Sequence, residues 1–115
     1  MWIHGEETTG MLEIDPDAFA AAHAAGGYVI DVREDYEYVA GHVPGARLTP
    51  LAHLVSVVTQ LPSTEPVYVI CASGNRSKAA AGMLRRVGLD AYSVAGGTAA
   101  WAQAGRPVVL GARER

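Results

Sequence analysis

The residue with the clearest chemical potential is Cys71, the only cysteine in the 115-residue chain. It directly follows residues 67–70, a run of β-branched and aromatic side chains that is typical of a buried strand. A short polar segment comes next and leads into a helical pattern; its members are Ala72, Ser73, Gly74, Asn75 and Arg76. A cysteine between a strand and a helix is well placed for nucleophilic chemistry, because open α/β sheets bind ligands beyond the carboxyl ends of their strands.

Such a loop favours the thiolate form of the cysteine. Its backbone N–H groups can turn towards the sulfur as an anion-binding nest, and the following helix adds unpaired donors and the positive end of its dipole. Gly74 permits a backbone conformation that is closed to other residues. Thiolate is the nucleophilic form, and a persulfide is also an anion that the same donors would stabilise, without a metal or an organic cofactor. A small buried structural cysteine is the alternative that these residues leave open.

The elements that must position Cys71 alternate along the chain. Short apolar runs predict strands near residues 11–14, 28–30, 46–48, 67–70 and 91–94. Helical patterns separate them: an alanine-rich segment after Asp15-Pro16, residues 34–40, residues 51–58, a segment from Arg76 and a short one with Trp101. Strands that alternate with helices predict an α/β fold with a mostly parallel sheet.

Periodicity predicts which side chains of three helices face the core. The predicted apolar faces are Tyr36, Val39 and Ala40 in the first, Leu51, Leu54, Val55 and Val58 in the second, and Ala80, Met83, Leu84 and Val87 in the third. Asp15-Pro16 and Thr49-Pro50 both predict a capped helix start with proline at the first helical position.

Composition bounds the class of protein. Half of the residues are apolar and the net charge is −3, which suits one compact folded domain. The nine basic residues form no long run, so we expect no nucleic-acid partner and no membrane partner. No apolar run approaches the roughly 20 residues that cross a bilayer, and residues 1–7 do not resemble a signal peptide. A single cysteine cannot form an internal disulfide or a cysteine-pair zinc site, and it suits a reducing, cytoplasmic location.

Three spaced segments carry a family resemblance. They are residues 71–77; Asp31-Val32-Arg33-Glu34 with Glu37 and residues 41–46; and Gly96-Gly97 with Trp101, Gly105 and Pro107-Val108. In this order they resemble the rhodanese-like family of sulfurtransferases, with residues 71–77 matching its active-site loop. The resemblance predicts a rhodanese-like domain at residues 11–110, an N-terminal extension at 1–10 and a tail at 111–115.

The resemblance implies a three-layer α/β sandwich with a central five-stranded parallel sheet. It also implies a double displacement without a cofactor: Cys71 takes sulfur from thiosulfate or a persulfide and passes it to cyanide or a thiol. Residues 72–76 would bind the substrate, while Asp31, Arg33 and Ser77 would support the loop. For Arg33 the alternative is an ordinary salt bridge that stabilises a turn.

The donor and the acceptor stay open at this point. Ala72 and Ser73 are neutral, whereas family members that favour thiosulfate often carry cations there. A sulfur-relay protein is therefore a candidate partner, and a sulfur-carrier or protein-interaction module with little free turnover is the alternative function. The loop from Cys71 to Arg76 is shorter than in related phosphatases, which disfavours a phosphatase or an arsenate reductase.

The remaining candidates have structural interpretations. We expect His42 to be structural and the other histidines, which share no metal-ligand spacing, to lie at the surface: His4, His23 and His53. Ser77 is expected to cap backbone donors of the helix, and Asn75 either takes a left-handed conformation or orients a substrate. Trp101 is expected in the core or at its rim.

Overall fold

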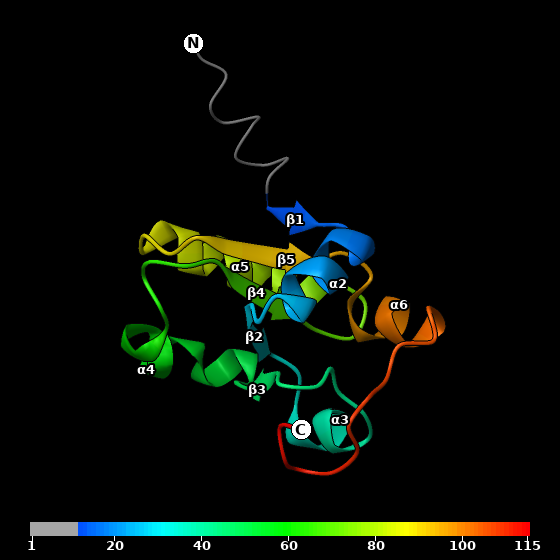
Figure 1. The fold of residues 1–115 in the computed structure, drawn as a ribbon. Helices are drawn as coiled ribbons and strands as arrows, with labels where there is room; N and C mark the ends of the chain where they lie inside the picture. Colours follow the sequence, from blue (N-terminus) through cyan, green and yellow to red (C-terminus); the bar gives the residue numbers. More distant parts are fainter. Residues whose placement is uncertain (1–11) are drawn as a thin grey trace.

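The computed structural model describes residues 12–115, which form a five-stranded sheet flanked by helices (Figure 1). The strands are β1 (Glu13–Ile14), β2 (Tyr28–Asp31), β3 (Arg47–Leu48), β4 (Val67–Ile70) and β5 (Ala91–Val94). Their order in the sheet is β1-β5-β4-β2-β3, and every neighbouring pair is parallel. The predicted α/β class with a parallel sheet is confirmed.

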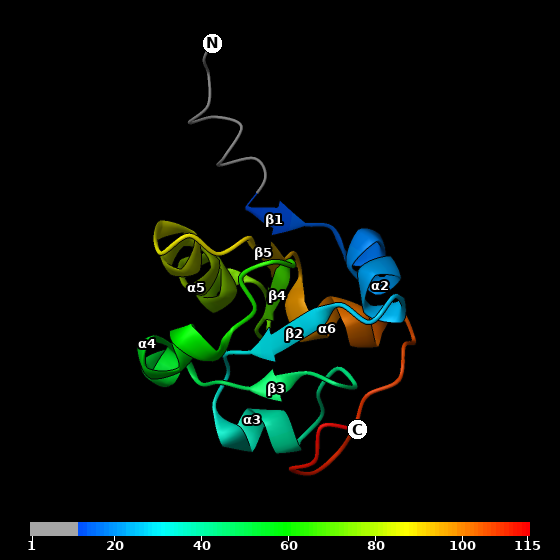
Figure 2. The ribbon, with the colours of Figure 1, turned by 60° about the vertical axis from the view of Figure 1, so that its left-hand side comes forward.

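Helices cover both faces of this sheet (Figure 2). They are α2 (Pro16–Ala24), α3 (Asp35–Val39), α4 (Leu54–Val57) between the 3₁₀ turns η1 (Leu51–His53) and η2 (Val58–Gln60), α5 (Asn75–Arg86) and α6 (Gly97–Gln103). Helices α4 and α5 pack on one face, α2 and α6 pack on the other, and α3 lies beside the β3 edge. In the part of the chain that the structure describes, no helix is long and apolar enough to span a membrane.

The central strand β4 is buried on both faces. Val67 and Val69 belong to the core under α4 and α5, and Ile70 belongs to the core under α2 and α6. Strands of parallel sheets are usually covered on both sides, and such buried elements are the last to open locally. Cys71, which directly follows β4, is therefore attached to a rigidly held strand.

Helix α2 begins as the sequence predicts. The Asp15 side chain caps it by accepting a hydrogen bond from the Ala18 N–H at 2.9 Å, and Pro16 occupies the first helical position. The capped start explains why a mostly alanine segment forms a helix here, since capping satisfies donors that would otherwise lack a partner.

The predicted apolar face of α3 is wrong. Tyr36 is 71% exposed and Val39 is 40% exposed, whereas Tyr38 is only 1% exposed. The Tyr38 hydroxyl donates to the carbonyl of Ala46 at 2.5 Å, and its ring stacks on His42 with 3.6 Å between the centroids. In a helix of five residues these specific contacts outweigh the spacing of the apolar side chains.

Residues 51–60 form a broken helix instead of the continuous amphipathic helix that periodicity predicts. The backbones of His53 (φ −103°, ψ 2°) and Val57 (φ −113°, ψ 2°) leave helical values, so one α turn stands between two 3₁₀ turns. As a result Leu54 is buried but Val55 is 70% exposed.

Two smaller details also differ from prediction. Pro50, not Thr49, occupies the N-cap of η1, and no side chain caps this turn. Val87, predicted on the apolar face of α5, is 59% exposed because it is the C-cap residue beyond the end of the helix.

The segment of residues 109–114 returns to the turn after α3 (Figure 1). His42 and Val109 exchange backbone hydrogen bonds at 3.0 and 2.8 Å. The N–H of Gly111 donates to the carbonyl of Val39 at 2.8 Å, and the N–H of Gly45 donates to the carbonyl of Glu114 at 2.7 Å. This segment therefore closes the edge of the fold next to α3.

Candidate functional site

Cys71 lies at the carboxyl end of the sheet, as the sequence predicts, and helix α6 holds its peptide unit. The Cys71 carbonyl accepts hydrogen bonds from the backbone N–H and the hydroxyl of Thr98 at 2.8 and 3.0 Å. The next carbonyl, that of Ala72, accepts from the N–H of Ala99 at 3.1 Å. Since these carbonyls face α6, the amides that follow are free to turn towards the sulfur.

The loop closes around the sulfur atom. The backbone N–H groups of Gly74 and Ser77 donate to Cys71 Sγ, with N···S distances of 3.1 and 3.4 Å. The Ser77 hydroxyl oxygen lies 3.3 Å from Sγ, and Cys71 has no exposed surface. Donors that converge on one atom form a nest for an anion.

These contacts change the acidity of the thiol. Burial acts to raise the pKa of Cys71, because the thiolate loses its hydration. Hydrogen bonds from the Ser77 hydroxyl and from the loop amides act in the opposite direction and prevail, so the pKa of the Cys71 thiol is lowered from its ordinary value. The site therefore favours the nucleophilic thiolate.

Two glycines make this loop possible. Gly74, the N-cap of α5, has a φ of +112°. Gly97 has a φ of +57°, and a Cβ placed there would lie 2.5 Å from the carbonyl oxygen of Cys71. Asn75 is an exposed residue in the first turn of α5, so the left-handed position in the loop belongs to Gly74 and not to Asn75.

The guanidinium of Arg76 is paired with Glu37 on α3. Its two terminal nitrogens donate to the two carboxylate oxygens of Glu37 at 2.8 and 2.9 Å. These hydrogen bonds lower the pKa of Glu37 to about 2, although burial opposes them. Sequence reasoning missed this contact, although Glu37 stands in the spaced motif that carries the family resemblance.

Asp31 and Arg33 pair with each other in the interior. Arg33 Nε and Nη2 donate to the Asp31 carboxylate at 2.9 and 2.8 Å, and Nη2 also donates to the carbonyl of Gly41 at 2.9 Å. Within residues 12–115, no hydrogen bond joins either side chain to residues 71–77. The pair fixes the turn that follows α3.

Ser77 contacts the sulfur instead of capping the helix, because Gly74 holds the N-cap position. Its hydroxyl oxygen lies 2.7 Å from that of Ser93 on β5, and both residues are fully buried. Sequence reasoning also missed Ser93, since one serine inside a strand carries no motif signal; only the sheet order, which places β5 beside β4, brings it to the site.

Comparison with known proteins now identifies the family. A family model described as the rhodanese-like domain matches residues 15–104. The chain belongs to the rhodanese-like family. Its three spaced segments, its five-stranded parallel sheet and the position of Cys71 agree with this assignment.

Several relatives of this rhodanese-like chain are informative. Thiosulfate sulfurtransferase GlpE of Pseudomonas fluorescens (strain SBW25) is 34% identical over 89 residues, which cover 76% of this chain and 82% of that protein. The crystal structure of a rhodanese-related protein from Thermoplasma volcanium superposes with a TM-score of 0.80 at 35% identity, covering 85% of this chain and 97% of the other. A rhodanese-like domain protein from Staphylococcus aureus gives a TM-score of 0.74 at 31% identity, covering 79% and 91%.

His42 is a buried structural residue of this rhodanese-like domain. Its Nδ1 and Nε2 atoms lie 2.8 Å from the carbonyl of Tyr38 and 2.7 Å from the carbonyl of Arg113. It makes no hydrogen bond with Cys71 in the described part of the chain, so the ring serves the packing of α3 and residues 109–114.

The other histidines and the tryptophan differ in their surroundings. His23 is partly buried, and its Nε2 donates to the carbonyl of Pro44 at 2.7 Å, so the prediction of a surface residue is wrong there. His53 is exposed as predicted, and His4 lies outside the described residues. Trp101 is 6% exposed and belongs to the core under α2 and α6, as predicted.

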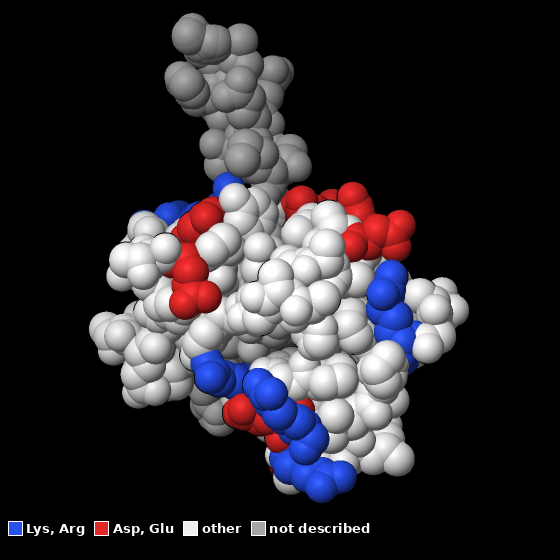
Figure 3. Space-filling view, viewed as in Figure 1, with Lys and Arg blue, Asp and Glu red and all other residues white. Residues whose placement is uncertain are grey.

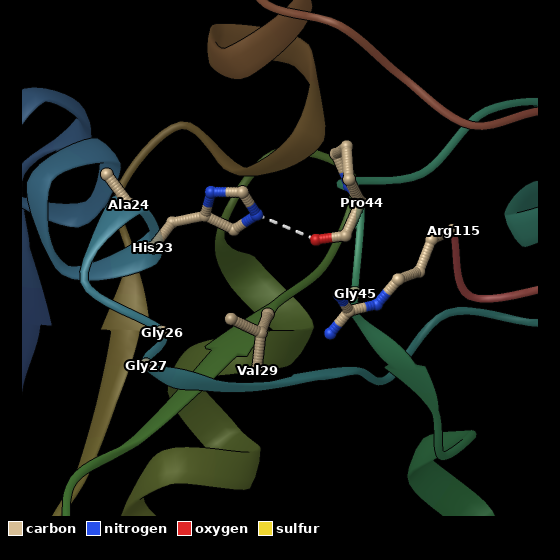
Figure 4. Close-up of a pocket in the computed structure, with 8 residues that line it drawn as sticks. All are labelled: His23, Ala24, Gly26, Gly27, Val29, Pro44, Gly45 and Arg115. Carbon is tan, nitrogen blue, oxygen red and sulfur yellow. Dashed lines mark hydrogen bonds between the residues drawn. The ribbon is translucent and has the colours of Figure 1, made fainter.

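The rhodanese-like domain has a separate pocket at the end of the sheet opposite to Cys71 (Figure 4). Its volume is about 320 Å³, and its walls include His23 at the end of α2 and the turn at Pro44 and Gly45 before β3. Because these residues precede strands β2 and β3, the pocket opens at the amino ends of the strands. It shares no lining residue with the Cys71 loop.

Metal-ligand chemistry gives no second site within residues 12–115. On the face drawn in Figure 3, acidic side chains lie mostly near the top, and basic side chains form a group near the bottom with acidic atoms beside it. Among residues 12–115 there is no group of three or more His, Cys, Asp or Glu side chains that is placed to hold a metal ion. The Cys71 loop is therefore the candidate for chemistry in this domain.

Proposed function

We propose that this rhodanese-like domain transfers sulfane sulfur through a persulfide on Cys71. The observation that supports this most strongly is the convergence of two backbone N–H groups and the Ser77 hydroxyl on Sγ. Fixed donors aimed at an anion stabilise it without reorganisation, and both the thiolate and the persulfide are anions. The sulfurtransferase name of the relative from Pseudomonas fluorescens supports the same class of reaction.

The reaction has two balanced steps. The Cys71 thiolate attacks the outer sulfur of a donor such as thiosulfate; a new S–S bond forms, the S–S bond of the donor breaks, and sulfite leaves with the bonding electrons. Cyanide or a thiolate then attacks the outer sulfur of the persulfide, which forms thiocyanate or a new persulfide and regenerates the Cys71 thiolate. The covalent intermediate divides one transfer into two easier displacements.

The burial of Cys71 adds a requirement to this proposal. The residue has no exposed surface, so a donor cannot reach Sγ while the loop is closed. Ala72 is partly exposed and Ser73 is exposed, whereas Gly74 is buried at the start of α5. We therefore expect residues 72–73 to move outward when a donor enters.

The test is intact-protein mass spectrometry after incubation with thiosulfate, and again after cyanide is added. Transfer predicts a gain of one sulfur atom that cyanide removes with formation of thiocyanate. The Cys71→Ser variant should gain nothing while its circular dichroism spectrum stays that of the parent chain. Sulfur transfer by that folded variant would overturn the proposal.

A second candidate is a sulfur-carrier module that receives sulfur from a partner protein. The closed loop and the neutralised charge of Arg76 favour it, because both disfavour entry of a small dianion. Full loading of Cys71 by a desulfurase-bound persulfide, with none by small donors, would support the carrier; rapid turnover on thiosulfate alone would exclude it.

A further inference from the structure

In the described part of the chain, both basic side chains in the first turn of α5, Arg76 and Lys78, are paired with carboxylates. Arg76 and Lys78 are the only Lys or Arg residues between positions 71 and 84. Lys78 Nζ lies 3.5 Å from the carboxylate of Glu13 on β1, while Arg76 makes its two hydrogen bonds to Glu37. The described contacts to the sulfur thus come from neutral donors, while Arg76 and Lys78 each have a carboxylate partner.

Arg76 stands in the first turn of α5, directly before Ser77, whose N–H and hydroxyl contact Cys71 Sγ. The pKa of Arg76 is raised, first by its hydrogen bonds to Glu37 and to a smaller extent by the charge of the Cys71 thiolate. Its side chain is 37% exposed and that of Glu37 is 21% exposed, so water screens the pair only in part. With Glu37 ionised the pair is neutral; without that carboxylate, a full positive charge would stand beside the loop.

We propose that Glu37 is a specificity-determining residue that selects sulfur donors by their charge. The proposal rests on the sulfur transfer proposed above. By neutralising Arg76, Glu37 removes the attraction that would favour a doubly charged donor such as thiosulfate. The neutral donors around Sγ then suit donors with one negative charge at the reacting group, the class of alkyl thiosulfonates and alkyl persulfides.

Thiosulfate and methanethiosulfonate are sulfur donors of similar shape and different charge, so they can test selection by charge. Thiosulfate carries two negative charges, and methanethiosulfonate carries one because a methyl group replaces an anionic oxygen. In both cases the Cys71 thiolate attacks the outer sulfur and forms the same persulfide. The S–S bond of the donor breaks, and sulfite or methanesulfinate leaves with the bonding electrons. The intrinsic difference between these leaving groups cancels when the ratio of kcat/KM for the two donors is compared between variants of the chain.

The experiment measures kcat/KM for both donors, with cyanide as acceptor, in the parent chain and in Glu37→Gln. Glutamine keeps the oxygen that accepts the Glu34 N–H at the start of α3, so the helix cap is preserved. We expect the thiosulfate-to-thiosulfonate ratio of kcat/KM to rise by about fivefold in Glu37→Gln, and the rise to shrink as salt is added.

Asp35→Asn is the matched control. Asp35 is an exposed residue of the same helix, and its substitution changes the net charge by the same amount without freeing Arg76. The ratio of kcat/KM for thiosulfate to that for methanethiosulfonate should be the same in Asp35→Asn as in the parent chain. The double variant Glu37→Gln/Arg76→Gln removes both charges of the pair, so its ratio should return towards the parent value.

The outcomes distinguish this inference from the function on which it rests. An unchanged ratio in Glu37→Gln, or the same rise in Asp35→Asn, would overturn the selector role while sulfur transfer stands. Failure of both donors to load Cys71 in the parent chain would overturn the transfer of sulfur from small donors, and the selector role with it.

Discussion

The hydroxyl oxygens of Ser77 and Ser93 lie 2.7 Å apart, and that of Ser77 lies 3.3 Å from Cys71 Sγ. A thiolate can only accept hydrogen bonds, so with an ionised sulfur the Ser77 hydroxyl donates to Sγ and the Ser93 hydroxyl donates to Ser77. Ser93 thereby orients the Ser77 hydroxyl that donates a hydrogen bond to Sγ, without contacting Sγ itself.

Loss of either hydroxyl should raise the pKa of Cys71. We expect the pKa of Cys71 to rise by about one unit in Ser77→Ala and by about half of that in Ser93→Ala. A hydrogen bond to a charged group contributes about 1.5 kcal/mol, and one pKa unit equals about 1.4 kcal/mol. The measurement is the rate of alkylation by iodoacetamide as a function of pH. Ser56→Ala, at an exposed serine, is the control; inflection points that coincide in all variants would refute this role.

The Gly97→Ala substitution should distort the Cys71 loop. A Cβ at this position would lie 2.5 Å from the carbonyl of Cys71, and the φ of +57° disfavours any side chain. We expect a loss of about 2 kcal/mol or more in the free energy of unfolding, together with slower loading of Cys71.

Gly82→Ala is the matching glycine substitution in α5, where no atom outside the adjacent turns of the helix backbone lies within 4 Å of the new Cβ. It should raise the free energy of unfolding by about 0.5–1 kcal/mol, because alanine is the better helix former. Urea denaturation measures both variants. Equal effects in the two would contradict the crowding seen at Gly97.

Arg33→Gln should destabilise the fold by about 3–5 kcal/mol, because it leaves the carboxylate of Asp31 buried without its partner. The double variant Asp31→Asn/Arg33→Gln should recover part of this loss. In the folded double variant the alkylation pH profile of Cys71 should match that of the parent chain, since the pair has no hydrogen bond to the loop. A shifted inflection point would show that the pair acts on the sulfur.

Acid should weaken the link between Glu37 and Arg76. The pKa of Glu37 falls from 4.5 to about 2 on folding, so its pair stabilises the fold above pH 4.5 and loses that contribution as the pH falls towards 2. The stability advantage of the parent chain over Glu37→Gln should therefore be constant above pH 4.5 and decline below it. Urea denaturation at several pH values tests this, and a constant advantage down to about pH 3 would contradict it.

The sequence predicts the sheet better than the contacts between side chains. The strand at residues 67–70 and the left-handed Gly74 follow from local residue types, because β-branched runs and glycines act within a few positions. The partners Glu37 and Ser93 do not, since they approach the loop from α3 and β5, and their contacts depend on how these elements pack. The predicted apolar face of α3 is wrong for the same reason. The burial of Tyr38 depends on its contact with Ala46, which helical spacing does not reveal.

Residues 109–114 hold the turn that follows α3, although they lie far from it in the sequence. Residues 12–103 already contain the whole Cys71 loop and every strand of the sheet. The backbone partners of Val39, His42 and Gly45 come only from the later segment. The frame around α3, which carries Glu37, therefore depends on residues that belong neither to the sheet nor to the loop.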